Sequence, residues 1–284
     1  MRTFDKTNED IAWCPGCGNY LILNILKEAL KELNLPVEST VLVSGIGQAA
    51  KLPQYVNCNF FNGLHGRALP VATAIKTANK FLNVIVTSGD GDIYGEGGNH
   101  FIHAIRRNPN ITVLVHDNMV YGLTKGQPSP TSSSNFPTKT QPQGSGIEPF
   151  NPIATAISLN ASFVARAFCQ DNVQTKEIIK NAISHKGFSL VDIFQPCVIF
   201  NKLNTYRWFK ENTYYLEEGY VPDNRVRAFE RSLESEKLPL GIFYKADKPT
   251  FEESKVNVSR TYKPLYQHNI NNRKEIDNLL KNYL

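Results

Sequence analysis

The sequence has no long apolar run, no secretion signal and no dense block of a single charge. No stretch is long and apolar enough to span a membrane. Residues 1–13 are polar and carry Asp5, Glu9 and Asp10, so they lack the basic start and the apolar stretch of a signal peptide. The 31 Lys and Arg residues are spread along the chain against 26 Asp and Glu, and the net charge is only +5. We therefore expect a cytoplasmic protein that has neither a membrane nor a nucleic acid as a partner.

Cysteine is scarce, at five residues in 284, and the number is odd. Few cysteines and no export signal in a chain of this size argue against a disulfide framework, so we expect the thiols to serve a metal or a redox role. Hydrophobic residues make up 41% of the chain and charged residues 20%. This composition is ordinary for a globular protein and excludes a disordered or fibrous one.

Short apolar runs alternate along the chain with stretches long enough for helices. Buried strands are predicted at residues 40–43, 84–87, 111–115, 163–167 and 188–193, and helices at residues 19–33, 68–80, 97–107 and 173–185. The alternation predicts an open, doubly wound α/β domain with a mostly parallel sheet over residues 1–200. From residue 201 the pattern loosens into Tyr, Asn, Lys and Glu, which predicts an irregular C-terminal extension over residues 201–284 that packs on a partner subunit.

The loops that follow three of the predicted strands are rich in glycine. They read Gly45-Ile46-Gly47, Gly89-Asp90-Gly91-Asp92 and Asp117-Asn118-Met119-Val120-Tyr121-Gly122. Ligands of parallel sheets bind beyond the carboxyl ends of the strands, so these loops are expected to converge on one site. The stretch over residues 124–152 is rich in Pro, Ser, Thr, Gly and Gln and is too long for a plain connection. We expect it to form an ordered loop over that site.

Asp90 and Asn118 have the residue types and the spacing of ligands for a divalent cation that holds a diphosphate. Such an ion takes hard oxygen ligands, and the carbonyl of Val120 is predicted to complete the protein's share of the shell. Gly89 and Gly91 would let the backbone approach the phosphates. Further cofactor contacts are predicted at Gly47, Asp92, Gly122, Leu123 and Thr124. Taken singly, the Gly-Asp-Gly run is more often a turn, Asn118 a loop residue and Gly47 part of a tight connection.

The Gly-Asp-Gly run followed by Asn118 resembles the thiamine-diphosphate signature, in which Asn-Asn stands where this chain has Asp117-Asn118. The second position, which is the metal ligand in that family, is kept. Four further runs resemble the β subunit of 2-oxoacid:ferredoxin oxidoreductases: Trp13-Cys14-Pro15-Gly16-Cys17-Gly18, Leu64-His65-Gly66-Arg67-Ala68, Gly98-Asn99-His100 and Gln195-Pro196-Cys197. The chain is thus similar to a subunit with a thiamine-diphosphate-binding fold that supplies half of an active site.

The resemblance implies oxidative decarboxylation of a 2-oxoacid to acyl-coenzyme A and carbon dioxide, with electrons passed through a [4Fe–4S] cluster to ferredoxin. It also implies thiamine diphosphate and Mg²⁺ as cofactors, and an α subunit that contributes the glutamate needed to activate thiamine. Two alternatives are a subunit of a non-oxidative thiamine-diphosphate decarboxylase or synthase, and a non-catalytic iron–sulfur or zinc scaffold. The cysteine placement speaks against the first alternative, and the pairing of Asp90 with Asn118 speaks against the second.

Three cysteines fall on positions that bind the cluster in that family: Cys14, Cys17 and Cys197. At the fourth position, after the Gly-Ile-Gly turn, this chain has Gln48, and glutamine is a poor ligand for iron. We predict that Cys58, ten residues later, supplies the missing thiolate. The alternatives are a cluster with a non-cysteine ligand, no cluster, or Cys58 as a small buried residue. Cys169 is expected to be structural.

His65 is predicted to contact the cofactor and to act in catalysis by moving a proton or polarising the substrate carbonyl, because imidazole titrates near neutrality. The alternative is a histidine that fixes its own loop. Lys51 is predicted to pair with the second carboxylate of 2-oxoglutarate, which favours that substrate over pyruvate, unless the lysine faces solvent. Arg67 is expected to bind a carboxylate or the diphosphate, or to tether the subunit interface. Leu123 and Lys125 complete the predicted substrate contacts, and coenzyme A is a further candidate for Lys125.

Overall fold

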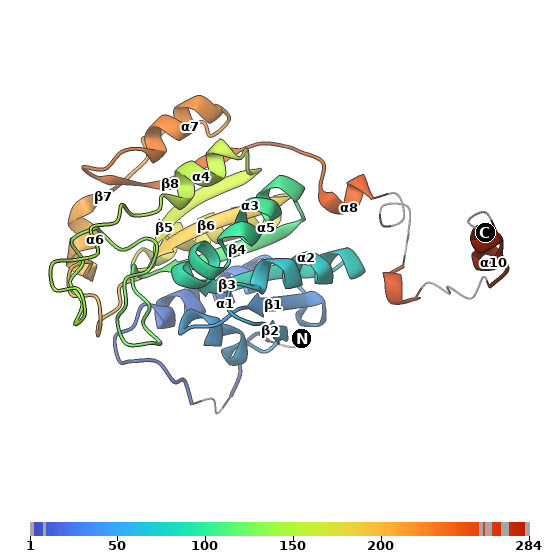
Figure 1. Ribbon diagram of the computed structural model, residues 1–284, viewed down its shortest axis with the longest axis horizontal. Coiled ribbons are helices and arrows are strands. Elements are labelled where there is room, and N and C mark those ends of the chain that lie inside the picture. Colours follow the sequence, from blue (N-terminus) through green and yellow to red (C-terminus); the bar gives the residue numbers. More distant parts are fainter. Residues whose placement is uncertain (1–2, 8–9, 256–257, 259–262, 268–272, 282–284) are drawn as a thin grey trace.

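The computed structural model, which describes residues 3–7, 10–255, 258, 263–267 and 273–281, is built around one eight-stranded sheet (Figure 1). The strand order is β2-β1-β3-β4-β6-β5-β8-β7. The strands are β1 Thr40–Ser44, β2 Asn59–Asn62, β3 Asn83–Gly89, β4 Ile111–Asp117, β5 Phe163–Phe168, β6 Phe188–Phe194, β7 Thr213–Tyr215 and β8 Leu238–Lys245. Neighbouring strands run parallel, except that β8 is antiparallel to β5. The prediction of an open, mostly parallel sheet is confirmed.

Helices cover both faces of the sheet (Figure 1). One face packs against α1 Asn19–Glu32 and α5 Asn172–Ser184. The other face packs against α2 Ala68–Ala78, α3 Gly98–Arg107, α4 Pro152–Ser158 and α7 Arg225–Ser232. Further helices are α6 Tyr206–Asn212, α8 Phe251–Ser254 and α10 Arg273–Lys281, the last of which lies away from the sheet (Figure 1). With both faces covered, ligands reach such a sheet at the carboxyl ends of its strands.

The central strands are buried on both sides. In β4, Val113 and Val115 pack with α2, α3 and α4, whereas Leu114 packs with α1 and α5. Every residue of β4, β5 and β6 is buried, and strands of this kind read as nearly continuous apolar runs. Asp117 at the end of β4 and Asp192 in β6 are therefore acidic groups inside an apolar layer.

The strands and helices predicted from periodicity are present within a few residues of their expected bounds. The segment after residue 201 is more regular than predicted, because it forms β7 and β8 and β8 joins the sheet beside β5. Pro239 and Gly241 interrupt the apolar run of β8, which is why this strand was not predicted. The domain boundary near residue 200 stays a prediction. Within the described residues, no helix is long and apolar enough to cross a membrane.

Candidate active site

The carboxyl ends of β1, β3 and β4 lie at one edge of the sheet, where the glycine-rich loops begin. The register places Val43 of β1 beside Val86 of β3, and Gly89 at the end of β3 beside His116 of β4. Asp90 and Asn118 therefore follow the tips of neighbouring strands. One turn of π-helix, Gly91–Glu96, follows Asp90 directly, and such turns are frequent at functional sites.

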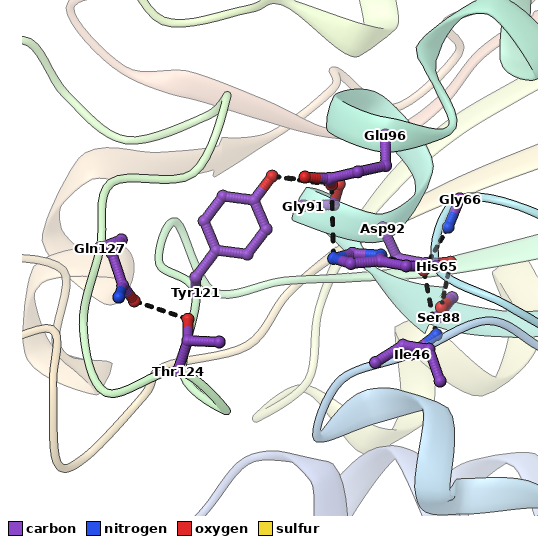
Figure 2. A network of polar contacts seen from close by, with 10 residues as sticks. All are labelled: Ile46, His65, Gly66, Ser88, Gly91, Asp92, Glu96, Tyr121, Thr124 and Gln127. Atoms are coloured by element: carbon purple, nitrogen blue, oxygen red, sulfur yellow. Dashed lines mark hydrogen bonds and ion pairs between the residues drawn. The ribbon is translucent and has the colours of Figure 1, made fainter.

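Asp92 is a buried carboxylate that joins the loops of this edge (Figure 2). Its Oδ1 accepts hydrogen bonds from the backbone nitrogens of Ile46 at 3.0 Å and of Gly66 at 2.8 Å, and lies 2.7 Å from Nδ1 of His65. Its Oδ2 accepts a hydrogen bond from the Ser88 hydroxyl at 2.8 Å. One side chain therefore ties together the loop after β1, the loop after β2 and the end of β3.

These bonds show a structural role for Asp92, and its predicted contact with the cofactor stays a prediction. Two carboxylate oxygens offer about four acceptor positions, and here three protein donors meet Oδ1 and one meets Oδ2. A Cβ atom at Gly45 would lie only 2.1 Å from Oδ2 of Asp92, so the loop can reach the carboxylate only because residue 45 is glycine. The observed role of Asp92 is to position the loops that surround the site.

His65 is held by Asp92 in a defined orientation (Figure 2). A carboxylate only accepts, so Nδ1 of the imidazole carries the hydrogen in this contact and Nε2 is the nitrogen that can exchange a proton. Nε2 lies 3.4 Å from Oε2 of Glu96, and the His65 side chain remains 38% exposed. The histidine thus fixes its own loop and still presents one nitrogen at the strand edge. Its predicted catalytic role stays a prediction.

Glu96 and Tyr121 belong to the same network, although sequence reasoning missed both. The Tyr121 hydroxyl donates a hydrogen bond to Oε2 of Glu96 at 3.0 Å (Figure 2). A Cβ atom at Gly91 would lie 2.2 Å from the tyrosine ring, and one at Gly95 would lie 2.5 Å from its hydroxyl. Burial and then Glu96 raise the pKa of Tyr121. The absence of a side chain at Gly91 makes room for this ring, and the contact of Gly91 with the diphosphate stays a prediction. The four-residue spacing of the two glycines was the signal available in the sequence.

Asp90 and Asp117 share one hydroxyl group. Both carboxyls are buried, and Oγ1 of Thr131 lies 2.7 Å from Oδ2 of Asp90 and 2.8 Å from Oδ1 of Asp117. A hydroxyl donates one hydrogen, so it serves one carboxyl at a time. Burial raises the pKa of Asp90 to about 6, and burial together with the charges of Asp192 and Asp90 raises the pKa of Asp117 well above its usual value. Because Thr131 belongs to the stretch over residues 124–152, the prediction that this stretch covers the site is confirmed.

Asp192 adds a third buried carboxyl to this pair. It lies 3.4 Å from Nε of Arg166 and accepts a hydrogen bond from the Tyr94 hydroxyl at 2.9 Å. Burial raises its pKa, and Arg166 opposes that shift. Among the described residues one buried guanidinium, that of Arg166, accompanies these three carboxyls, whose pKa values are raised. A divalent cation at Asp90 would favour their ionised forms. The donor set at the tip of β3 therefore fits a hard cation.

The metal-free chain is expected to gain stability from Asp90 as the pH falls from 7 to about 5. The pKa of Asp90 in the folded chain, about 6, lies above the ordinary value of 3.8, so the folded state binds more protons between these values and stability falls as the pH rises through them. Thermal melts in a chelator should show a Tm gain on acidification that is about 2–4 °C larger for the wild type than for Asp90→Asn. Equal gains in both proteins would contradict the raised pKa.

Other predicted cofactor contacts lie on the same loops and have partners within the protein. Oδ1 of Asn118 accepts a hydrogen bond from the nitrogen of Val120 at 3.0 Å, and Oγ1 of Thr124 donates to Oε1 of Gln127 at 2.5 Å (Figure 2). Gly47 has a φ of +127° and no atom within 4 Å of its Cβ position, so its backbone is open to a ligand. Their contacts with Mg²⁺ and the diphosphate stay predictions.

The structure gives a protein partner to one of the four residues predicted to contact the substrate, and the other three are exposed. Nζ of Lys51 donates a hydrogen bond to the carbonyl of Ala12 at 3.2 Å, so this lysine holds the N-terminal loop. Arg67 is exposed at the start of α2, and Leu123 and Lys125 are exposed on the loop after β4. Their substrate contacts stay predictions.

Three cysteines line one pocket beside this edge, together with Gln48, Asn118 and Gly122: Cys14, Cys17 and Cys197. Burial raises the pKa of Cys17 to about 11, and the neighbouring thiols of the other two add to the shift. Nε2 of Gln195 lies 3.4 Å from the sulfur of Cys17, in position to donate a hydrogen bond. The predicted grouping of these three cysteines is therefore observed.

Cys58 does not join them, and this prediction is wrong. Asn59 pairs with Val41 in the parallel register of β2 and β1, so Cys58 lies beside Thr40 at the start of β1. Gln48 follows the opposite end of β1, and a strand of that length spans about 13 Å. Cys58 instead packs against the core on the side of α1. Cys169 is fully buried in the same core, as expected for a structural residue.

No group of three or more His, Cys, Asp or Glu side chains in the described part of the chain forms a ready single-ion site. The predicted magnesium site does not need one, because it uses one carboxylate, one amide and one carbonyl. Thiolates that bind different iron atoms of a cluster also stand farther apart than the ligands of one ion. The residues present therefore fit both groups.

A cavity of about 630 Å³ lies beside the buried carboxyls and was not predicted from the sequence. It is bordered by Asp117, Thr131 and Arg166 on one side and by Trp208 and Leu233 of the C-terminal segment on the other. The segment after residue 201 thus forms part of the wall of a cavity next to the buried carboxyls.

Comparisons with known proteins agree with this geometry. A family model described as the thiamine pyrophosphate enzyme C-terminal TPP binding domain matches residues 39–193, which is more than half of the chain, and one that describes the C-terminal part of the pyruvate ferredoxin oxidoreductase beta subunit matches residues 197–260. The chain is 43% identical over 261 residues to the 2-oxoacid:ferredoxin oxidoreductase 2 beta subunit of Aeropyrum pernix, covering 87% of this chain and 84% of that one. The chain belongs to the 2-oxoacid:ferredoxin oxidoreductase β-subunit family.

This β subunit is also 35% identical over 242 residues to the 2-oxoglutarate synthase subunit KorB of Methanocaldococcus jannaschii, covering 85% of this chain and 90% of that one. A solved 2-oxoglutarate:ferredoxin oxidoreductase from Magnetococcus marinus, with 2-oxoglutarate, coenzyme A and succinyl-CoA bound, matches it with a TM-score of 0.90 and 35% identity. That match covers 97% of this chain and 94% of the other. The family resemblance seen in the sequence is confirmed.

Proposed function

We propose that this β subunit, joined to an α subunit in the cytoplasm, converts a 2-oxoacid, coenzyme A and oxidised ferredoxin into acyl-coenzyme A, carbon dioxide and reduced ferredoxin. We favour 2-oxoglutarate over pyruvate as the substrate, because a relative is named 2-oxoglutarate synthase and the related solved structure holds 2-oxoglutarate. The observation that carries the proposal is the single pocket that Asn118 and Gly122 share with the three thiols. It brings the predicted diphosphate loop next to groups that can bind an electron-accepting cluster.

Asp90, Asn118 and the carbonyl of Val120 would hold Mg²⁺, and the backbone near Gly89 and Gly122 would face the diphosphate. Thiamine diphosphate, when bound, supplies the carbon chemistry that cleaves the 2-oxoacid. The three thiols would hold a [4Fe–4S] cluster that takes up electrons one at a time. The segment after residue 201 would pack on the α subunit.

The residues of this chain contribute orientation and a proton. Asp92 keeps a hydrogen on Nδ1 of His65, so protonation takes place at Nε2, beside Glu96. A hydrogen on Nε2 can stabilise negative charge on a substrate carbonyl oxygen. A cation at Asp90 would favour the ionised forms of the neighbouring carboxyls of Asp117 and Asp192, so it would bind with release of protons from this buried group.

The purified β chain alone is expected to show no reduction of ferredoxin by 2-oxoglutarate and coenzyme A, and addition of the α chain is expected to restore it. The reason is that the glutamate needed to activate thiamine is supplied by the α subunit in this family. Spectroscopic assays with 2-oxoglutarate and with pyruvate test both parts. Turnover by a β preparation shown by mass spectrometry to be free of α chain would contradict the subunit requirement, and a higher kcat/KM for pyruvate would contradict the substrate.

A further inference from the structure

Gln48 lines the pocket that holds the thiols of Cys14, Cys17 and Cys197, and no fourth cysteine lines it. Its Oε1 is buried and has no hydrogen-bond partner, which is an unfavourable state for a carboxamide oxygen. Its backbone carbonyl accepts a hydrogen bond from Nε1 of Trp13 at 2.8 Å. Because Trp13 directly precedes Cys14, this bond holds residue 48 against the loop that carries two of the thiols.

Other side chains are poorly placed for the fourth position. Cys58 lies at the opposite end of β1. Gln195 lines the same pocket, but its Nε2 faces the sulfur of Cys17 at 3.4 Å, so it serves as a donor to a thiolate. Asn118 turns its Oδ1 to the nitrogen of Val120. Two side chains that line this pocket have a buried carboxamide oxygen without a hydrogen-bond partner, Gln48 and Gln195. The amide nitrogen of Gln195 is already engaged with the sulfur of Cys17 and the carbonyl of Pro196. Gln48 is held against the cysteine loop by its bond to Trp13, so its oxygen is the better placed of the two.

We infer that Oε1 of Gln48 binds the fourth iron of a [4Fe–4S] cluster whose other three irons are bound by Cys14, Cys17 and Cys197. The inference rests on the proposed function, because it assumes that the cluster is present. A carboxamide is neutral and hard, whereas a thiolate is anionic and soft. The cluster would therefore carry one negative charge fewer than a four-cysteine cluster, have a higher reduction potential, and lose the iron at that corner more easily.

The test uses the anaerobically purified complex of α and β chains, as wild type and as Gln48→Cys, Gln48→Ala and Cys58→Ala. Ferricyanide takes one electron from the oxidised cluster, which then releases one Fe²⁺ and leaves a [3Fe–4S] cluster with a characteristic paramagnetic resonance signal. We expect this signal to be strong in the wild type and largely lost in Gln48→Cys, whose reduction potential should also be lower. Gln48→Ala should be isolated with three irons per cluster in place of four, and Cys58→Ala should match the wild type in all three measurements.

Gln195→Ala is the matched control within the pocket. It removes the donor to the sulfur of Cys17, so we expect a lower reduction potential with all four irons retained. Loss of iron from Cys58→Ala or Gln195→Ala, with four irons kept in Gln48→Ala, would overturn the inference. An unchanged potential and an unchanged ferricyanide response in Gln48→Cys would do the same.

Failure of the inference and failure of the proposed function give different results. Iron and sulfide present in the wild type, with Gln48 variants that behave like it, would reject the role of Gln48 alone. A wild-type complex that binds thiamine diphosphate by calorimetry but contains no iron would reject the cluster and the inference together. Unchanged thiamine diphosphate binding in each variant shows that the variant is folded.

Discussion

Asp90→Asn is expected to weaken the binding of thiamine diphosphate and Mg²⁺ to the complex by about 100-fold or more, and to reduce turnover in parallel. Asp90 is the one carboxylate among the three predicted ligands, and its replacement leaves only neutral oxygens for the ion. It is buried beside Asp117 and Asp192, whose pKa values are raised in the metal-free chain, so the ion would replace protons in this group of carboxyls. Titration calorimetry of the cofactor in the presence of Mg²⁺ measures the change directly.

Asp223→Asn provides the control for this change, because it makes the same substitution at an exposed aspartate outside the site. Its cofactor affinity is expected to equal that of the wild type. If Asp90→Asn bound thiamine diphosphate as tightly as Asp223→Asn, Asp90 would have no place among the ligands of the ion. A loss of binding in Asp90→Asn with an unchanged circular dichroism spectrum would separate the ligand role from a folding defect.

The central strands were predictable because burial on both faces leaves little freedom in their residue types. Strands β1, β3, β4, β5 and β6 are short apolar runs, and the helices between them show the helical period. Strand β8 lies near the edge of the sheet and contains Pro239 and Gly241. Its pairing depends on β5, far away in the sequence, so a local pattern could not reveal it.

Site residues could be placed from the sequence only where a polar residue directly follows a predicted strand. The placement of Asp90 and Asn118 after neighbouring strands was predictable in this way, whereas Asp92, two residues on, bonds to Ile46, His65 and Ser88. Their separate roles come from the π-helical turn that starts after Asp90, and residue spacing does not show it. Cys58 was misplaced for a related reason. Ten residues is a short separation in sequence, but here the chain returns along β1 to the start of the strand before β2 begins.

Asp92→Ala is expected to destabilise the β subunit by about 3–5 kcal/mol, because it removes a buried carboxylate that accepts from the backbone nitrogens of Ile46 and Gly66 and pairs with His65. For a chain of this size the Tm should fall by about 10 °C. Asp92→Asn should cost less, since the amide oxygen still accepts from both nitrogens and the amide nitrogen can face the Ser88 hydroxyl. The amide holds His65 less firmly in one tautomer, so kcat should fall by about 100-fold while the fold is retained. Thermal melts and steady-state kinetics of the complex measure the two effects separately.

A double-mutant cycle decides whether Asp92 acts on the reaction through His65. If it does, Asp92→Asn combined with His65→Asn should have about the same kcat as His65→Asn alone, because the orientation of an absent imidazole no longer matters. Ser88→Ala breaks only the bond to the other carboxylate oxygen of Asp92, so it should cost about 1 kcal/mol of stability and change kcat little. Multiplicative losses in the double mutant would show that Asp92 and His65 act independently. The contact of 2.7 Å between them would then stabilise the loops without affecting proton transfer at Nε2.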